Sequence, residues 1–329
     1  MNHQEARACL YLGTGGKGCV EPVREGKELC FWHDPSASKD GPDIKERLEK
    51  MASEGASMEG FILKEAKLRD AHLTFGDTSH AVNLSHADLS RADLGGAHLF
   101  NIDLRDASLL KANLRQANLN RARLEDANLL GADLEGARLE QVNWGRHLSQ
   151  EVLAQKATRA GQAERAMDLY LEAEEIYRHL TNIVEAKGHY NQAGHFYHKE
   201  KIMRRMQMRR WTREWMWSKI VDVLCGYGEN FDRVIGFSLS AILVSAVLFA
   251  LLGIQGPEGM VRLNLHVGMA ENMKSFLLCV YYSVVTFTTL GYGDFTPVGW
   301  SRLVAASEAF TGAFAMALFV VVFVRHMTR

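Results

Sequence analysis

The sequence predicts a multidomain chain in which a β-solenoid and an α-helical connector precede a membrane domain with two spanning helices. Leucine recurs at every fifth residue from 84 to 139, a period that fits neither a helix nor a strand. Helical spacing follows these repeats, and two long runs near the C-terminus are almost free of charged residues. The 329 residues suffice for several domains, and the formal net charge of -1 gives no indication of a nucleic-acid partner.

Three of the five cysteines lie in the first thirty residues, which favours a metal site over a disulfide framework. With a nearby histidine they form the pattern C-x9-C-x10-C-x2-H, and thiolates with an imidazole suit tetrahedral zinc. The four candidate ligands are Cys9, Cys19, Cys30 and His33. We predict a structural Zn2+ site in an N-terminal knob (1–40), with unrelated cytosolic thiols as the alternative. A linker with a short helix is expected over 41–55, and the polar N-terminus does not resemble a signal peptide.

The five-residue period defines residues 56–146 and predicts a repeat architecture. Each unit has a leucine, preceded two positions earlier by a small residue, chiefly alanine, as in "ADLSRADLGGAHL". The leucines stand at 84, 89, 94, 99, 104, 109, 114, 119, 124, 129, 134 and 139, and Trp144 continues the register. Upstream units, displaced by one residue near Ala81, have Met58, Leu63, Leu68, Leu73 and Thr78 at this position.

This pattern resembles the pentapeptide-repeat family, whose motif is A(D/N)LXX. The resemblance implies a right-handed, four-sided β-solenoid in which four pentapeptides make one coil and leucine and alanine fill the interior. It is specific for fold and says little about function. An unidentified regulatory ligand or protein could bind the solenoid. The outward positions mix basic and acidic residues, so they do not resemble the DNA-like acidic face of some pentapeptide proteins.

Residues 147–210 have helical spacing, and "GHYNQAGHFYHKE" resembles the second half of a tetratricopeptide repeat. We therefore expect an α-helical connector, in which the histidines are structural and not metal ligands. These are His179, His189, His195 and His198. Tryptophans alternate with basic residues over 211–230, which favours a helix lying along the inner membrane surface.

Residues 231–329 are predicted to form the membrane domain. The run 234–257 is uncharged, and the run 303–324 holds a single charge, so each can cross a bilayer. A third uncharged stretch, 275–293, ends in threonine and glycine and suits a helix that enters the membrane and stops. Basic residues concentrate before the first run and after the second, which places both termini in the cytoplasm. Buried core helices are the alternative.

The stretch "TFTTLGYGDFTP" at 286–297 lies between the two apolar runs. Glycine tolerates positive φ, so this backbone can turn its carbonyl groups toward one side. A ring of carbonyls can replace the hydration shell of a cation, but one chain supplies too few of them. The motif therefore indicates a symmetric oligomer around an axis.

"TTLGYGD" resembles the selectivity filter of potassium channels, with Leu290 where valine is usual. The order of segments resembles the two-transmembrane tetrameric channels of bacteria, over 231–325. The resemblance implies a homotetramer in the lipid bilayer of the bacterial inner membrane that conducts K+. It implies an outer helix at about 232–254, a re-entrant pore helix at about 273–287, a filter at 288–294 and an inner helix at about 300–325. No arginine-rich helix precedes the outer span, so no voltage sensor is expected.

The resemblance also assigns residues. The ion-binding positions are Thr289, Leu290, Gly291, Tyr292 and Gly293. Thr288, Asp294, Tyr281 and Tyr282 are expected to support the filter, with the Tyr292 ring packed near the two tyrosines. Val285 stands where some channels have a glutamate bonded to the outer aspartate.

Two residues of the inner helix leave alternatives open. Gly312 is either a point of close helix packing or a gating hinge. Glu308 is an acid within the membrane, which makes it a functional candidate. It either faces a water-filled cavity or is protonated or hydrogen-bonded behind the pore helix.

The sequence thus predicts a potassium-selective channel and not an enzyme, because no catalytic constellation is present. A channel that does not discriminate potassium from sodium is one alternative. A membrane-anchored interaction scaffold built on the solenoid is the other.

Overall fold

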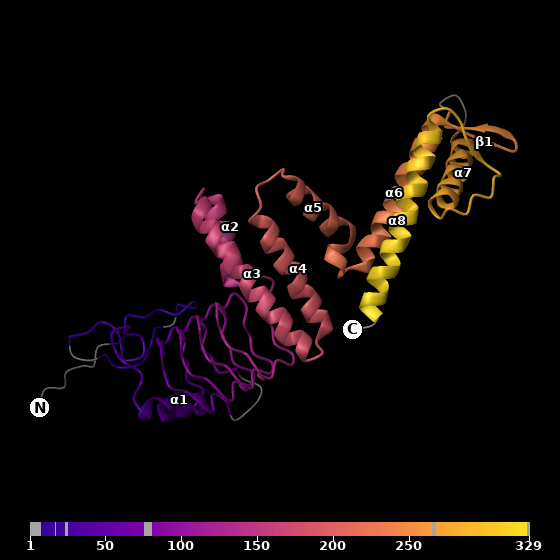
Figure 1. The fold of residues 1–329 in the computed structure, drawn as a ribbon. Coiled ribbons are helices and arrows are strands. Elements are labelled where there is room, and N and C mark those ends of the chain that lie inside the picture. The colour runs from indigo at the N-terminus through magenta and orange to yellow at the C-terminus, as the bar shows by residue number, and fades with distance from the viewer. Residues whose placement is uncertain (1–7, 17, 24–25, 76–80, 265–267, 328–329) are drawn as a thin grey trace, which may run out of the picture. The chain divides into compact units, whose positions relative to one another are not determined.

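The computed structural model describes residues 8–16, 18–23, 26–75, 81–264 and 268–327 (Figure 1). The chain divides into two compact units, Met1–Gln207 and Met208–Arg329. The first unit holds the N-terminal knob, the repeats and three helices, and the second holds the apolar helices.

The repeats stack as coils joined by parallel backbone bridges. Partners along the stack are 20 residues apart, as in Asn83 with Asp103 and Asp88 with Ser108. The repeat leucines and the small residues two positions before them are buried, most of them at 0–2% exposure. The period of five therefore places every leucine inside, and the predicted interior is confirmed.

A tight turn closes each repeat. At one such corner Ala92 N–H donates to Leu89 C=O at 3.0 Å, and Arg91 between them has φ 59°. Most corners hold Arg, Lys, Asp, Gln or another non-glycine residue at this positive φ. Such residues seldom adopt this conformation, so the stacked hydrogen bonds of neighbouring coils must maintain it.

The first coil is longer than the others. Ile62 pairs with Asp88 and His72 with His98, so these partners are 26 residues apart instead of 20. The separation falls from 26 at His72 to 20 at Asn83, so the six additional residues lie between these two positions. Thr78, assigned to the repeat register from sequence, lies outside the described residues.

The N-terminal end of the solenoid is covered by the knob and by α1 (Asp43–Ser53). Ile62 N–H donates to Trp32 C=O at 2.8 Å, and the Trp32 ring stacks on Phe61 with centroids 5.1 Å apart. His72 N–H donates to Glu49 of α1 at 2.8 Å. The segment assigned to a linker is thus partly a packed helix, which occupies edge hydrogen-bonding groups that could otherwise pair with another chain.

The other end of the solenoid continues into α2 (Ser149–Arg159), α3 (Ala163–Ala186) and α4 (Tyr190–Met206). Glu151 of α2 is buried and accepts from Tyr177 of α3 at 2.6 Å and from Lys199 of α4 at 3.1 Å. Burial and the Glu151 carboxylate raise the pKa of Tyr177, so the phenol remains a donor. One ion-paired carboxylate therefore links the three connector helices.

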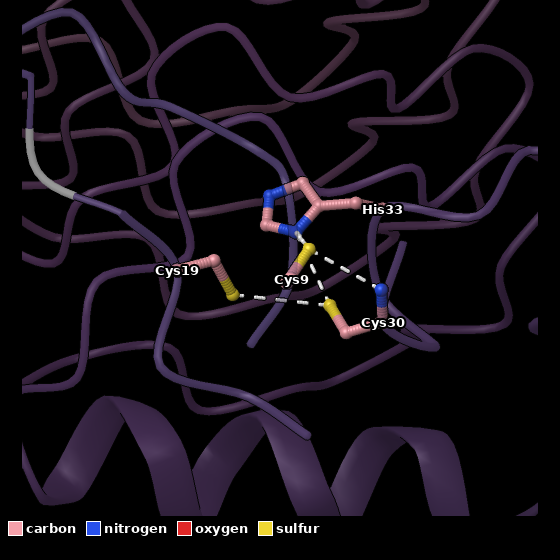
Figure 2. A group of neighbouring side chains, drawn as sticks. All are labelled: Cys9, Cys19, Cys30 and His33. Atoms are coloured by element: carbon pink, nitrogen blue, oxygen red, sulfur yellow. Dashed lines mark hydrogen bonds between the residues drawn. The ribbon is translucent and has the colours of Figure 1, made fainter. Parts of the chain in front are cut away.

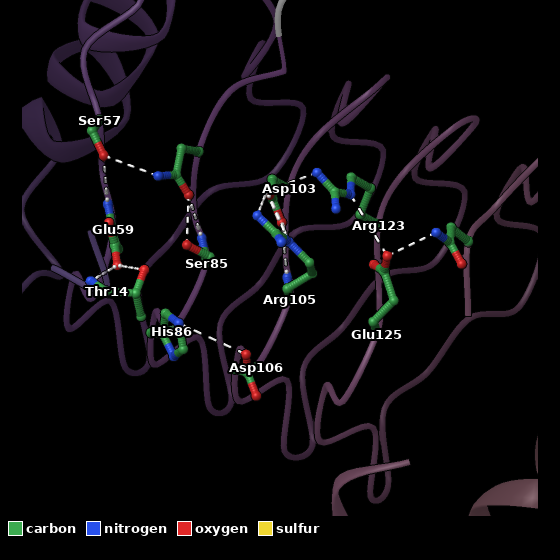
Figure 3. Close-up of polar contacts among 12 residues, drawn as sticks. Thr14, Ser57, Glu59, Ser85, His86, Asp103, Arg105, Asp106, Arg123 and Glu125 are labelled. Carbon is green, nitrogen blue, oxygen red and sulfur yellow. Dashed lines mark hydrogen bonds and ion pairs between the residues drawn. The ribbon is translucent and has the colours of Figure 1, made fainter. Parts of the chain in front are cut away.

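A row of polar side chains follows one face of the solenoid from Thr14 to Glu125 (Figure 3). Asp103, 5% exposed, lies near its middle. Its carboxylate accepts from Arg105 Nε at 2.8 Å and Nη2 at 2.6 Å, and Arg123 Nη1 lies 3.5 Å away. Burial opposes ionisation of Asp103, but the hydrogen bonds from Arg105 and the two positive charges outweigh it and lower its pKa.

Replacing Asp103 with asparagine should lower the free energy of unfolding at pH 7 by about 1–3 kcal/mol, because the arginines lose a charged partner. The folded-state pKa is depressed, so the stabilisation is present above the unfolded pKa and lost as pH falls through the folded one. In thermal unfolding, the loss of stability relative to wild type should therefore be largest at pH 7 and should shrink as the pH is lowered toward 3. Asp106→Asn is the control, since Asp106 is more exposed and pairs with His86 at 3.7 Å. Equal losses in the two variants would contradict this prediction.

The second unit begins with α5 (Arg213–Cys225), a short turn η1 (Gly226–Gly228) and α6 (Phe231–Leu252). Three short strands follow in the chain: β1 (Ile254–Gly256), β2 (Gly259–Val261) and β3 (Thr296–Pro297). They form an antiparallel sheet in which β1 lies between β2 and β3. Between β2 and β3 lies α7 (Met269–Phe287), and α8 (Ser301–Met327) closes the chain. Within the described residues, α6 and α8 are the helices long and apolar enough to cross a membrane, and most of their surface is exposed in the single chain.

Candidate functional site

The backbone after α7 alternates between two conformations. Thr289, Gly291 and Gly293 have φ of 57°, 56° and 79°, while Leu290 and Tyr292 between them are not at positive φ. Alternation of left- and right-handed residues gathers successive N–H groups on one side of a chain and the carbonyls on the other. Positive φ is a genuine outlier for a β-branched residue such as Thr289, so the surrounding structure must enforce it.

Hydrogen bonds hold both ends of this segment. At its start, Thr289 N–H donates to Thr286 C=O and Leu290 N–H to Val285 C=O, each at 3.0 Å. Beyond its end, Tyr281 of α7 donates its phenolic hydrogen to Asp294 Oδ2 at 2.8 Å. The sequence pointed to Tyr281 and Asp294 as separate supporting residues, and the structure joins them in one contact.

The other supporting tyrosine lies elsewhere. Tyr282 is buried and packs edge-on against Phe249 of α6, with ring centroids 4.8 Å apart. The Tyr292 side chain is 66% exposed and Leu290 58% exposed in the single chain. The segment from Thr289 to Asp294 is thus exposed throughout, which leaves it available to other copies of the chain.

The inner helix α8 packs directly on the last residue of α7. A Cβ added to Gly312 would stand 1.9 Å from the Phe287 carbonyl oxygen and 2.7 Å from its carbonyl carbon. The neighbour is backbone, which cannot rotate away. This contact favours close packing as the role of the glycine. Phe287, which the sequence did not single out, immediately precedes the threonines of the motif.

One turn earlier, Glu308 of α8 lies beside Ser283 of α7. Glu308 is 4% exposed, and its Oε1 lies 2.5 Å from Ser283 Oγ. The carboxyl is therefore enclosed within the single chain, behind α7. Of the two alternatives for Glu308, this position matches a hydrogen-bonded group and not one that faces a water-filled cavity.

In the first unit, Cys9, Cys19, Cys30 and His33 converge, and their ligand atoms all lie within 4.8 Å of one another (Figure 2). Cys19 Sγ and Cys30 Sγ are 3.8 Å apart, and His33 Nδ1 is 3.6 Å from Cys9 Sγ and 3.2 Å from Cys30 Sγ. A tetrahedral zinc ion with ordinary bond lengths requires about 3.8 Å between two sulfur ligands and about 3.5 Å between sulfur and nitrogen. The side chains fit such an ion without large rearrangement. Among the described residues, the connector histidines join no comparable group.

The surroundings fix which nitrogen faces the cluster. His33 Nε2 lies 2.9 Å from the Glu59 carbonyl oxygen, which can only accept, so Nε2 carries the hydrogen. Nδ1 is then free to bind a metal, as in sites whose histidine is oriented by a backbone carbonyl. The Tyr11 ring stacks on the imidazole, with centroids 3.9 Å apart. Glu59 and Tyr11 were not recognised from sequence, because neither belongs to the Cys/His spacing.

The thiols do not ionise equally in the absence of a cation. Burial raises the pKa of Cys19 to about 12, and burial also raises that of Cys30. Burial opposes ionisation of Cys9 as well, but N–H groups of Cys30 and Tyr11 outweigh it and lower the pKa. Burial lowers the pKa of His33, which keeps it neutral as metal binding requires. A divalent cation would supply the charge that allows all three thiolates to form.

Comparison with known families gives matches for the C-terminal helices and for the repeats. Residues 235–329 match the sequence model of an ion-channel family. The chain contains an ion-channel domain. This domain includes α6, α7, the exposed segment and α8, and with its two apolar helices it indicates a membrane protein that conducts ions. Residues 83–121 and 107–143 match pentapeptide repeats, in eight copies.

This chain is also similar to several solved structures of pentapeptide repeat proteins. One from Nostoc PCC 7120 has 36% identity, covering 28% of this chain and 72% of that protein, with a TM-score of 0.25. One from Cyanothece 51142 has 31% identity, covering 27% and 59%, with a TM-score of 0.18. One from the thylakoid lumen of Arabidopsis thaliana has 23% identity, covering 35% and 82%, with a TM-score of 0.22. Curated proteins gave no significant match.

Proposed function

We propose that the chain is the subunit of a homotetrameric, potassium-selective channel of a bacterial inner membrane, with both termini in the cytoplasm. The observation that carries this proposal is the alternation of positive φ at Thr289, Gly291 and Gly293. It favours a row of carbonyls on one side of an extended chain, and such carbonyls can replace the water around K+. The right-handed solenoid and the re-entrant course of α7 belong to the same proposal.

Exposure of the filter residues supports the tetramer. A single row of carbonyls cannot surround an ion, whereas four copies around an axis can. Leu290 and Tyr292 are more than half exposed in the single chain, and burial against neighbouring subunits would remove this apolar surface from water. The exposed surfaces of α6 and α8 would then face lipid or other subunits.

Gating through the cytoplasmic part has a physical route within the second unit. Arg233 at the start of α6 donates to Asp222 of α5 at 2.9 Å. Arg325 near the end of α8 pairs with Glu229, just after the turn η1, at 2.8 Å. A displacement of α5 would therefore act on both spanning helices. We propose that these two contacts, Arg233 with Asp222 and Arg325 with Glu229, are the point where the N-terminal part influences the pore.

For the Cys/His cluster we propose a structural Zn2+ ion, held by Cys9, Cys19, Cys30 and His33. The donor set and the separations support zinc, and four protein ligands complete its preferred coordination.

Selectivity can be measured on the purified full chain in liposomes. With potassium on one side and sodium on the other, the reversal potential should lie close to the potassium equilibrium value, and barium should block. Equal permeability of the two ions would support the non-selective channel. Absence of any current from a correctly assembled tetramer would support the scaffold.

A glycine pair tests the role of the filter backbone. Gly291→Ala should abolish selective current, because a left-handed residue with a side chain costs about 1–2 kcal/mol and the carbonyl would turn out of the row. Gly299→Ala is the matched control, since Gly299 has a similar φ of 53° against 56° and each has open space around it. The control should retain selective current. Equal behaviour of the two variants would contradict the proposed filter.

A further inference from the structure

A buried carboxyl connects three helices of the ion-channel domain. Glu308 of α8 has its Oε1 next to Ser283 of α7, and Ser245 of α6 lies beside the same carboxyl. All three residues are buried, with Ser283 at 0% and Glu308 at 4% exposure. Glu308 Oε2 has no hydrogen-bond partner among the described residues.

The hydrogen bonds of Ser283 indicate the charge state of the Glu308 carboxyl. Ser283 Oγ lies 2.8 Å from the Ile242 carbonyl of α6 and 2.5 Å from Glu308 Oε1. A hydroxyl has one hydrogen, and the carbonyl can only accept, so Ser283 donates to Ile242. The second contact then requires a hydrogen on Glu308. The ionised alternative would bury a carboxylate with one oxygen unpartnered and without a cation recorded against it, which is far more costly than burying a neutral acid.

The location of the acid relates it to the filter. Ser283 precedes Phe287 by four residues and Glu308 precedes Gly312 by four, so the two pairs lie one helical turn apart on facing surfaces of α7 and α8. The second pair is the contact that places the α8 backbone against the last residue of α7. The hydrogen bond at Glu308 therefore fixes the last turn of the helix from which the filter emerges.

We infer that Glu308 binds a proton and acts as a neutral positioning residue, whose O–H holds α7 to α8 and keeps the filter in its conducting geometry. This inference rests on the proposed channel function. Loss of the proton at alkaline pH would place a negative charge against the Ser283 oxygen, because the Ser283 hydrogen is donated to the Ile242 carbonyl. It would break the donation to Ser283 and lower the current. Among the described residues, the titratable group recorded beside Glu308 is the Tyr282 phenol on α7.

Glu308→Gln is the decisive variant, because a neutral amide of the same shape can still donate to Ser283. Its current at pH 7 should equal that of wild type within about twofold, whereas Glu308→Ala should reduce current by about tenfold or more, because it removes the buried hydrogen bond that joins α7 to α8. Raising the pH from 7 to 10 should reduce the wild-type current and leave Glu308→Gln unchanged. Infrared spectra of the tetramer at pH 7 should show a protonated carboxyl stretch that Glu308→Gln lacks.

Three results would overturn the inference. One is a non-conducting Glu308→Gln tetramer alongside a conducting Glu308→Asp tetramer, which would show that the negative charge is needed. The second is an identical alkaline profile for wild type and Glu308→Gln. The third is absence of the protonated carboxyl band. Selectivity is read separately from the reversal potential, so failure of the potassium proposal would not be mistaken for failure of this one.

Discussion

Gly312→Ala is expected to abolish potassium current and to weaken the assembled tetramer. The added methyl would stand 1.9 Å from the Phe287 carbonyl oxygen, far inside van der Waals contact. Overpacking typically costs about 1–3 kcal/mol, and here the obstructing atoms are backbone, so the cost should lie at or above the upper end of that range. The strain falls on the residue that precedes the filter threonines.

The matched control is Gly236→Ala. Gly236 lies within α6, and a Cβ there would meet nothing within 4 Å. Alanine is favoured over glycine in a helix by about 1 kcal/mol, so this variant should assemble and conduct normally. Tetramer content by size-exclusion chromatography and current in liposomes would separate the two variants. A Gly312→Ala tetramer as stable and conductive as the control would contradict the packing contact.

The same experiment bears on the hinge hypothesis. A hinge residue would alter how often the pore opens and leave conductance and reversal potential unchanged. Close packing against Phe287 predicts changes in conductance and selectivity, because the filter itself is displaced. Single-channel records of any residual Gly312→Ala activity therefore distinguish the hinge from close packing. A measurement of total current alone would not, because both roles predict a reduced current.

Much of the fold could be predicted because its signals are local. Every repeat carries its own leucine and small residue, so burial of Leu89 or Leu104 follows from register alone. The six additional residues of the first coil changed the leucine register by only one residue. Five of the six make up one full repeat period, so they leave the spacing pattern unchanged. The positive φ at Arg91 could not be predicted from sequence either, because neighbouring coils impose it on a residue type that does not favour it.

Site residues could likewise be predicted where they are neighbours in sequence, but not where packing brings distant residues together. The motif residues from Thr289 to Asp294 are contiguous, so they could be named from sequence. The partners of Gly312 and Glu308 are 25 residues away on another helix, and only packing brings Phe287 and Ser283 to them. Sequence could therefore state the alternatives for both residues without deciding between them.

Cys30→Ser is expected to remove the metal and to loosen the first coil of the solenoid. Structural zinc sites in small domains contribute about 10–16 kcal/mol, so loss of one thiolate should leave no zinc after purification, against one per wild-type chain. The consequence should extend beyond the knob, because Trp32, two residues from Cys30, accepts the Ile62 N–H at 2.8 Å. His33 also donates to Glu59, at the edge of the same coil.

Metal analysis and amide hydrogen exchange on the full chain test this prediction together. Exchange at Ile62 should accelerate in Cys30→Ser, while Leu104, whose N–H donates to Arg123 C=O at 2.9 Å within the stack, should keep its protection. Cys225→Ser is the control, since that buried cysteine lies in the second unit and should change neither zinc content nor exchange at Ile62. Acid should release zinc from wild type, because protons compete for the thiolates. Wild-type protein without zinc would refute the metal site. A zinc-free variant with unchanged Ile62 exchange would instead confine the metal's role to the knob, since the Trp32 and Glu59 contacts would then hold without it.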